Sequence, residues 1–199
     1  MIRRVSDMDC VMLAAGRSRR METWKMTLPL GDASLIERSV GTALEACGRV
    51  VVVAGHRGEE LAALLRDLDG VRVIVNSAFD EGMFSSVRCG VREVRSARFF
   101  LALGDMPLVA ADTYRTLAAS AGGVGQGIPA IIPRYRGKKG HPLLLDSSVG
   151  QRILDAPAQW TLREVLAEVP NLLVPVEDPH VLQDVDTPED YRHLRLADS

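Results

Sequence analysis

The amino-acid sequence predicts an α/β fold, with a mostly parallel sheet and helices on both faces. Strand and helix patterns alternate along the chain, and residues 50–54 form an unbroken run of Val and Ala. Such a run is typical of a strand buried on both faces of a parallel sheet. The chain has 199 residues, of which 47% are hydrophobic, so we expect a single domain over residues 1–199 with one sizeable core.

The expected elements begin with a strand at residues 9–13. A capping box at residues 34–37 then starts a helix that ends before Gly48. The remaining elements are, in order, a strand at 50–54, a helix at 59–68, a strand at 71–75, a helix capped by Ser85 or Ser86, a strand at 99–103, a helix opened by Asp112 or Thr113, strands at 130–132 and 143–145, a helix opened by a second capping box at 161–164, an apolar run at 172–176, and a last helix that Thr187 caps.

Charge and cysteine content exclude several classes of protein. The formal net charge of −2 gives no reason to expect nucleic acid or an anionic membrane as a partner. The N-terminus lacks the apolar core of a signal peptide, and no run approaches the ~20 apolar residues of a membrane span. We therefore expect a cytoplasmic protein. Its cysteines, Cys10, Cys47 and Cys89, have neither disulfide nor zinc-ligand spacing and are expected to be reduced.

A small-residue turn and a cluster of cations directly follow the first strand. The turn consists of Ala14, Ala15 and Gly16, and the cations are Arg17, Arg19, Arg20 and Lys25. Backbone N–H groups of small residues, together with positive side chains, suit a polyphosphate. The alternative interpretation of the charges alone is a solvated basic surface loop. Neither the P-loop pattern GxxxxGK[ST] nor the dinucleotide fingerprint GxGxxG is present here.

Residues that follow the other strands are also candidates, because ligands of open parallel sheets bind at the carboxyl ends of the strands. After the second strand, Gly55 could let the backbone approach a base or ribose, and after the third, Gly82, Ser85 and Ser86 could form an anion-binding helix start. The later candidates are Gly104 and Asp105 after the fourth strand, and Asp184 and Asp186 near the end. The aspartates are either helix or turn caps or ligands of a hard metal ion, and Asp184 could be a simple surface charge.

The loop resembles the signature of the molybdenum-cofactor nucleotidyltransferases, which runs Ala-Ala-Gly-x-Ser-x-Arg-Met-Gly and then reaches a Lys. The residues on motif positions are Gly16, Ser18, Arg20, Met21 and Lys25. The chain departs from the motif at Glu22, where the family has Gly. Leu-Gly-Asp-Met-Pro around Asp105 and Asp-Val-Asp-Thr-Pro around Asp186 resemble the family's two metal-binding segments, and Gly-His-Pro at His141 resembles a segment beside its second substrate.

The resemblance implies a Rossmann-like three-layer α/β/α fold of the nucleotide-diphospho-sugar transferase type. It also implies an enzyme that couples a nucleoside triphosphate to the phosphate of molybdopterin, or molybdenum cofactor, and releases pyrophosphate. Asp105 and Asp186 would hold Mg²⁺. The catalytic residues would be Lys25, Arg20 and Asp105, and His141 would bind the acceptor. The implied nucleotide-binding residues are Leu13, Ala14, Ala15, Gly16, Ser18, Arg20, Lys25, Gly55, Gly82, Ser85, Ser86 and Gly104.

Ala14-Ala15 resembles the cytidylyl version of the loop rather than the guanylyl version, Leu-x-Gly-Gly, so CTP is the expected nucleotide. A molybdoenzyme or its maturation chaperone is a further expected partner. Two alternatives stay open. One is a cytidylyltransferase for another phosphorylated alcohol, and the other is a non-catalytic maturation factor for molybdenum hydroxylases, for which Glu22 is the only indication.

Overall fold

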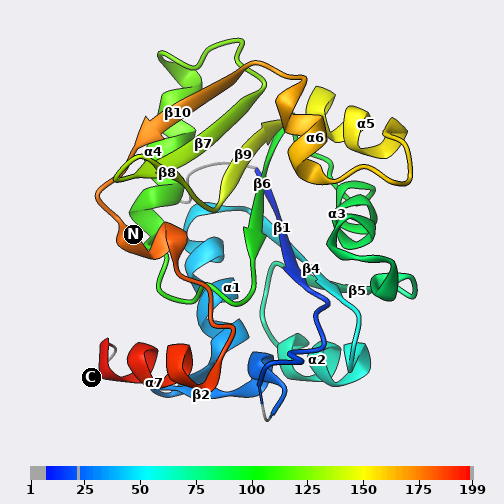
Figure 1. Cartoon of the computed structure of the whole chain (residues 1–199), viewed down its shortest axis with the longest axis vertical. Helices are drawn as coiled ribbons and strands as arrows, with labels where there is room; N and C mark the ends of the chain where they lie inside the picture. Colours follow the sequence, from blue (N-terminus) through cyan, green and yellow to red (C-terminus); the bar gives the residue numbers. More distant parts are fainter. Residues whose placement is uncertain (1–7, 22, 198–199) are drawn as a thin grey trace.

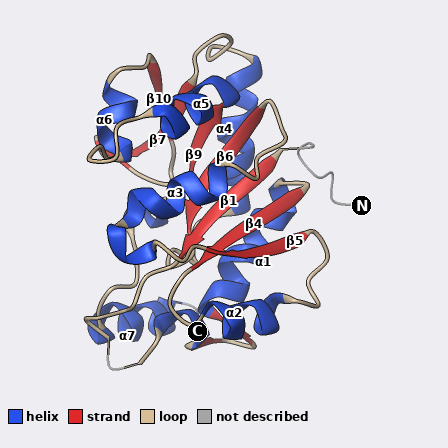
Figure 2. Cartoon of the chain, turned by 90° about the vertical axis from the view of Figure 1, so that its right-hand side faces the viewer, coloured by secondary structure: helices blue, strands red, loops and turns tan. Residues whose placement is uncertain are grey.

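The computed structural model describes residues 8–21 and 23–197 and consists of a central sheet between two layers of helices (Figures 1 and 2). The sheet has the strand order β10-β7-β9-β6-β1-β4-β5, with β8 paired to β7. Its strands are β1 (Asp9–Ala14), β4 (Arg49–Ala54), β5 (Val71–Val75), β6 (Arg98–Leu103), β7 (Ala130–Tyr135), β8 (Lys138–Lys139), β9 (Leu143–Asp146) and β10 (Asn171–Pro175). Only β8 and β9 run antiparallel to their neighbours, so the predicted mostly parallel sheet is confirmed.

The helices divide between the two faces of this sheet. They are α1 (Leu35–Ala46), α2 (Gly58–Leu65), α3 (Met83–Val91), α4 (Ala111–Gly122), α5 (Ser147–Asp155), α6 (Leu162–Ala167) and α7 (Pro188–Ala197). Side chains of β1 alternate between the faces: Cys10 and Met12 pack with α1, α2 and α4, whereas Val11 and Leu13 pack with α3, α5 and α6. The strand is therefore apolar from Cys10 to Ala14, because both of its faces are covered.

Three helix starts differ from the prediction. Helix α3 begins at Met83 with Gly82 as its N-cap, so the predicted caps Ser85 and Ser86 lie inside its first turn. Helix α4 begins at Ala111, and the Asp178 carboxylate, far away in the sequence, accepts hydrogen bonds from Ala110 N and Thr113 Oγ1. Helix α5, which the sequence analysis missed, begins after β9, where Asp146 accepts from Ser148 N at 2.9 Å.

Both capping boxes are confirmed. Ser34 caps α1 with Glu37 as its reciprocal partner, and Thr161 and Glu164 make the same arrangement at α6. At α7, Asp190 N donates to Thr187 Oγ1 at 3.2 Å, and Thr187 N donates to the Asp190 carboxylate at 2.7 Å.

Strand β1 lies at the point where the strand order of the sheet reverses. It pairs with β4 on one side and with β6 on the other. The connections that leave β1 and β6 therefore run to opposite sides and open a crevice between them. Two short strands, β2 (Pro29–Leu30) and β3 (Ala33–Ser34), extend the connection after β1. Three 3₁₀ turns, η1 (Lys25–Thr27), η2 (Phe79–Glu81) and η3 (Pro179–Leu182), lie in the connections that approach the crevice. Among the described residues, no helix is long and apolar enough to cross a membrane.

Candidate functional site

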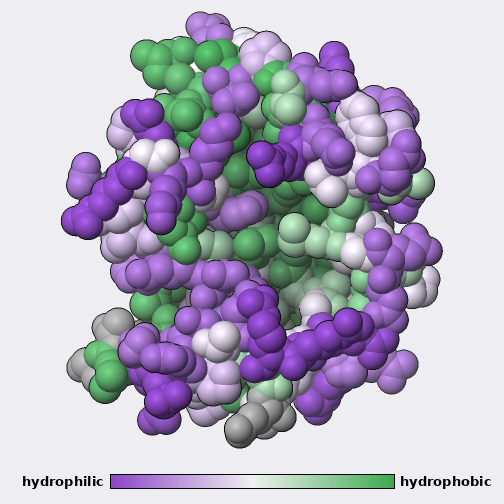
Figure 3. All heavy atoms as spheres, viewed as in Figure 1, coloured by the Kyte–Doolittle hydropathy of each residue, from purple (hydrophilic) through white to green (hydrophobic). Residues whose placement is uncertain are grey.

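A cavity of about 660 Å³ opens at the carboxyl ends of β1 and β6. Figure 3 shows the hollow at the centre of this face, with a band of hydrophilic side chains along its lower border. Four segments far apart in the sequence line it: the β1 connection, the end of β6, the segment from η2 into α3, and the segment before α7. Its size falls within the range of small-molecule sites.

The predicted small-residue turn forms the wall of the cavity next to β1. Leu13, Ala14, Ala15, Gly16 and Ser18 all line it. Within this connection Ser18 has a positive φ of 52°, and its hydroxyl accepts a hydrogen bond from Lys25 N at 3.2 Å. Ser18 therefore stabilises the path of the loop that delivers Lys25 to the cavity. Glu22, where the chain departs from the nucleotidyltransferase motif, lies outside the described residues.

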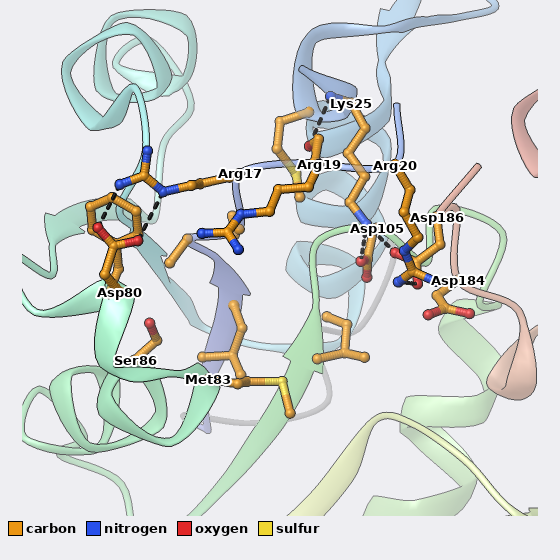
Figure 4. A pocket seen from close by; sticks show the side chains of 18 residues that line it. Arg17, Arg19, Arg20, Lys25, Asp80, Met83, Ser86, Asp105, Asp184 and Asp186 are labelled. Atoms are coloured by element: carbon orange, nitrogen blue, oxygen red, sulfur yellow. Dashed lines mark hydrogen bonds and ion pairs between the residues drawn. The ribbon is translucent and has the colours of Figure 1, made fainter. Parts of the chain in front are cut away.

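The cations of the loop face partners of opposite charge (Figure 4). Arg17 lies over the Phe79 ring and makes a two-pronged ion pair with Asp80, which lowers the pKa of that carboxyl group. Arg20 pairs with Asp186. Arg19 makes no ion pair among the described residues, and Figure 4 shows it reaching into the cavity.

Lys25 joins the two aspartates that the sequence analysis singled out. Its ammonium nitrogen lies 2.7 Å from Asp105 Oδ2 and 2.8 Å from Asp186 Oδ1, and the residue is only 6% exposed. Burial alone would lower the pKa of Lys25, but the two carboxylates outweigh it and raise the pKa. Burial would likewise raise the pKa of Asp186, and Lys25 and Arg20 lower it instead. Lys25 and Asp186 are therefore both charged at neutral pH.

Asp184 is exposed and joins this cluster. One carboxylate oxygen from each of Asp105, Asp184 and Asp186 lies within 4.8 Å of the others. Burial, followed by the neighbouring Asp186 and Asp105, raises the pKa of Asp184.

Two observations indicate that these three residues fit a divalent cation. The Lys25 ammonium group stands as a cation between two of the carboxylates, and Asp105 Oδ1 is buried without a hydrogen-bond partner among the described residues. Converging carboxylate oxygens are the donors that Mg²⁺ prefers.

At the opposite end of the cavity, Asn76 fixes the orientation of the Ser86 hydroxyl group. Ala78 N donates to Asn76 Oδ1 at 3.0 Å, so the Asn76 amide must direct its N–H groups to Ser85 Oγ and Ser86 Oγ, at 2.9 and 3.0 Å. Ser86 is 2% exposed and lines the cavity. Its oxygen accepts from Asn76, and no described residue accepts its proton, so the Ser86 hydroxyl is available to a ligand in the cavity.

Two predicted glycines serve packing instead of the cavity lining. A Cβ atom at Gly55 would stand 2.6 Å from the Phe79 ring and 2.8 Å from the Ala15 carbonyl oxygen. At Gly104 it would stand 2.7 Å from Ile36. Neither glycine lines the cavity, and their approach to a nucleotide stays a prediction. Their missing side chains let neighbouring chain segments pack closely.

Gly82 and Ser85 lie beside a second cavity, between the start of α3 and the α5–α6 connection. Gly82 adopts a φ of 108°, which favours glycine, at the turn into α3. The Ser85 hydroxyl donates to the carbonyl oxygens of Ala78 and Gly82 at 2.9 and 2.8 Å. Both residues therefore lie outside the main cavity, and their contact with a nucleotide stays a prediction.

His141 does not line the main cavity either, but it lies within electrostatic reach of Asp105. Burial lowers the pKa of His141, so the ring is neutral at pH 7, and its Nδ1 has no hydrogen-bond partner among the described residues. The structure thus brings Leu13, Ala14, Ala15, Gly16, Ser18, Arg20, Lys25, Ser86, Asp105 and Asp186 to one cavity and leaves Gly55, Gly82, Ser85, Gly104 and His141 outside its lining.

The sequence analysis assigned no role to several contributors to the cavity. Asp80 and Met83 are among those that line it, and Asn76 orients Ser86 from behind. The positions of Asp80 and Met83 after the third strand were the only signal for them. The role of Asn76 had no signal in the sequence, because it depends on which backbone N–H group meets its side chain.

Comparison with known proteins agrees with this geometry. Residues 10–173 match the family described as the MobA-like NTP transferase domain. The chain is 31% identical, over 94% of its length and 95% of the relative, to molybdenum cofactor cytidylyltransferase of Escherichia coli (strain K12). It is also 29% identical, over 95% of its length and 98% of the relative, to nicotine blue oxidoreductase of Paenarthrobacter nicotinovorans.

Solved structures are similar over nearly the whole chain. A nucleotidyl transferase from Methanothermobacter thermautotroptrophicus superimposes with a TM-score of 0.82 at 26% identity, covering 96% of this chain and 97% of the other. Rv0371C from Mycobacterium tuberculosis H37Rv, solved in complex with manganese, gives 0.76 at 26% identity, covering 96% and 98%. The fold is thus the Rossmann-like nucleotidyltransferase fold. With the family match and a relative above 30% identity, this chain belongs to the MobA-like NTP transferase family and is a nucleotidyltransferase.

Proposed function

We propose that residues 1–199 act as one nucleotidyltransferase domain that couples CTP to the phosphate of molybdopterin, or molybdenum cofactor, and releases pyrophosphate. The observation that carries the proposal is the charge arrangement of the cavity. Cations of the β1 connection face carboxylates from two separate segments across a space that suits a nucleotide. Relatives that act on molybdenum cofactor support the choice of acceptor.

The reaction needs alignment of two anions rather than a strong base. An oxygen of the acceptor phosphate, already ionised at neutral pH, forms a bond to the α-phosphorus of CTP. The bond from the α-phosphorus to the bridging oxygen breaks, and pyrophosphate leaves with the electron pair. Lys25, Arg20 and Arg19 stabilise the charge that develops on the leaving group, while Gly16 and Ser18 shape the loop around the phosphates.

Asp105, Asp186 and Asp184 are the residues that would hold Mg²⁺. The charged side chains that line the cavity balance: Arg17, Arg19, Arg20 and Lys25 against Asp80, Asp105, Asp184 and Asp186. A divalent cation would supply the additional positive charge that a triphosphate requires.

The Ser86 hydroxyl group supports cytosine as the base. No described residue accepts the Ser86 proton, so Ser86 can donate it to the ring nitrogen N3 of cytosine, which is an acceptor. The corresponding ring nitrogens of uracil and guanine carry hydrogens and cannot accept that proton. Ala14 and Ala15, across the cavity, leave room for a base and agree with the same choice.

The acceptor approaches from the side of Asp105 and His141, where the neutral imidazole stands near the reacting phosphates. A molybdoenzyme or its maturation chaperone would receive the product, and the reaction would take place in the cytoplasm. The test is pyrophosphate release from purified protein mixed with molybdenum cofactor, Mg²⁺ and either CTP or GTP. Release with CTP supports the proposal. Nucleotide binding without release would favour the non-catalytic maturation factor, and release only with another phosphorylated alcohol would change the acceptor.

A further inference from the structure

We propose that the ammonium group of Lys25 competes with the divalent cation for Asp105 and Asp186, so that the cation and the nucleotide bind as a coupled pair. The inference rests on the proposed function, because it takes the triphosphate to be the ligand of this cavity. It concerns what Lys25 does before substrate arrives.

The contacts of Lys25 identify the position that it holds. Its Nζ atom lies 2.7 Å from Asp105 Oδ2 and 2.8 Å from Asp186 Oδ1, and both residues belong to the carboxylate cluster. A Mg²⁺ ion bound by the same two oxygens would lie ~2.1 Å from each. The two cations therefore need the same gap, and they cannot occupy it together.

Charge explains why Lys25 stays there in the absence of a ligand. Three carboxylates whose oxygens lie within 4.8 Å repel one another unless a cation stands among them. Lys25 stands between two of them, and Arg20 pairs with Asp186 from the solvent side. Arg20 has a side chain 69% exposed and can turn away into water, whereas the side chain of Lys25 is only 7% exposed.

A buried ammonium group can leave its carboxylates only for another anion. The triphosphate in the same cavity is that anion, because Lys25 shares the cavity lining with Gly16, Ser18 and Arg19. When Lys25 moves to the phosphates, Asp105 and Asp186 become free for the divalent cation. Nucleotide binding should therefore raise the affinity for the cation, and by linkage the cation should raise the affinity for the nucleotide by the same factor.

Binding of Mn²⁺ alone, without nucleotide, tests the competition. Calorimetry and Mn²⁺ electron paramagnetic resonance would compare the wild-type protein with Lys25→Met and Lys25→Gln. We expect both variants to bind Mn²⁺ about tenfold more tightly than wild type, because the competing ammonium group is gone. Lys25→Arg, which keeps the charge, should stay as weak as wild type.

The matched control is Arg17→Met. It removes one positive charge from the same cavity, but Arg17 pairs with Asp80 and not with the three clustered carboxylates. Its affinity for Mn²⁺ should stay within about twofold of wild type, since only a screened long-range effect remains. If Lys25→Met and Lys25→Gln bind Mn²⁺ no more tightly than Arg17→Met, the competition does not exist and the proposal is overturned.

Thermal unfolding of each variant identifies a loss of fold, and the polar Lys25→Gln keeps the test decisive if Lys25→Met unfolds. The measurement also separates this inference from the proposed function. Failure of the wild-type protein to bind CTP with metal would overturn the proposed function, while the Mn²⁺ comparison without nucleotide would still decide the role of Lys25.

Discussion

Replacement of Ser86 by alanine tests how the cavity chooses its base. Ser86 is 2% exposed, its oxygen accepts from Asn76 at 3.0 Å, and no described residue accepts its proton, so that proton is available to a base in the cavity. Ser86→Ala removes one hydrogen bond to a cytosine acceptor. Such a bond contributes about 1 to 1.5 kcal/mol net, which is roughly a tenfold change in affinity for CTP.

Other nucleotides should be affected less. The ring nitrogens of uracil and guanine carry hydrogens and cannot accept the Ser86 proton. We therefore expect the affinities for UTP and GTP to change less than the affinity for CTP. The preference for CTP over UTP should fall by at most about tenfold, because the loss of CTP affinity sets the limit.

Calorimetry with CTP, UTP and GTP at one fixed metal concentration measures these preferences. Ser85→Ala is the matched control, because Ser85 accepts from the same Asn76 amide but donates to the backbone and lies outside the main cavity. Its base preference should match that of the wild-type protein. An unchanged preference in Ser86→Ala, or an equal change in Ser85→Ala, would refute the reasoning, and tighter binding of GTP than CTP by wild type would remove cytosine as the base.

Three further changes test the metal cluster, the packing and the pH response. Asp105→Asn and Asp186→Asn should each abolish pyrophosphate release without loss of the folded state, and the double variant should be scarcely worse; independent losses that multiply would show separate roles. Gly55→Ala should lower the free energy of unfolding by about 2 kcal/mol in urea titration, because its Cβ has no room, and unchanged stability would contradict the packing role. Burial would raise the pKa of Asp9, but hydrogen bonds from Arg49 and nearby backbone N–H groups lower it. The charged Asp9 side chain therefore stabilises the folded state at neutral pH, and this stabilisation is lost as pH falls through the lowered pKa. Asp9→Asn should therefore lower the free energy of unfolding by about 3 kcal/mol at pH 7. The difference from wild type should shrink below about pH 4 when unfolding is measured across pH. A difference that persists in acid would argue against this role of the Asp9 charge.

The sequence by itself determined the elements whose signals are local. The unbroken run in β4 and the capping boxes at α1 and α6 were predicted correctly, because burial on both faces and helix capping each depend on residues within one turn or strand. The loop after β1 was predicted as part of the site for the same reason. Its small residues and cations are contiguous, and an open parallel sheet places the end of such a strand at the crevice.

Only the tertiary structure decided how these parts combine. Asp105 and Asp186 lie 80 and 161 positions after Lys25 in the sequence, and no local pattern states that one ammonium group would bridge both. The role of Gly55 likewise depends on Phe79, which packs against the space that a side chain would need. Contacts of this kind arise when separate connections converge at one edge of the sheet, and a linear pattern does not contain the distances between them.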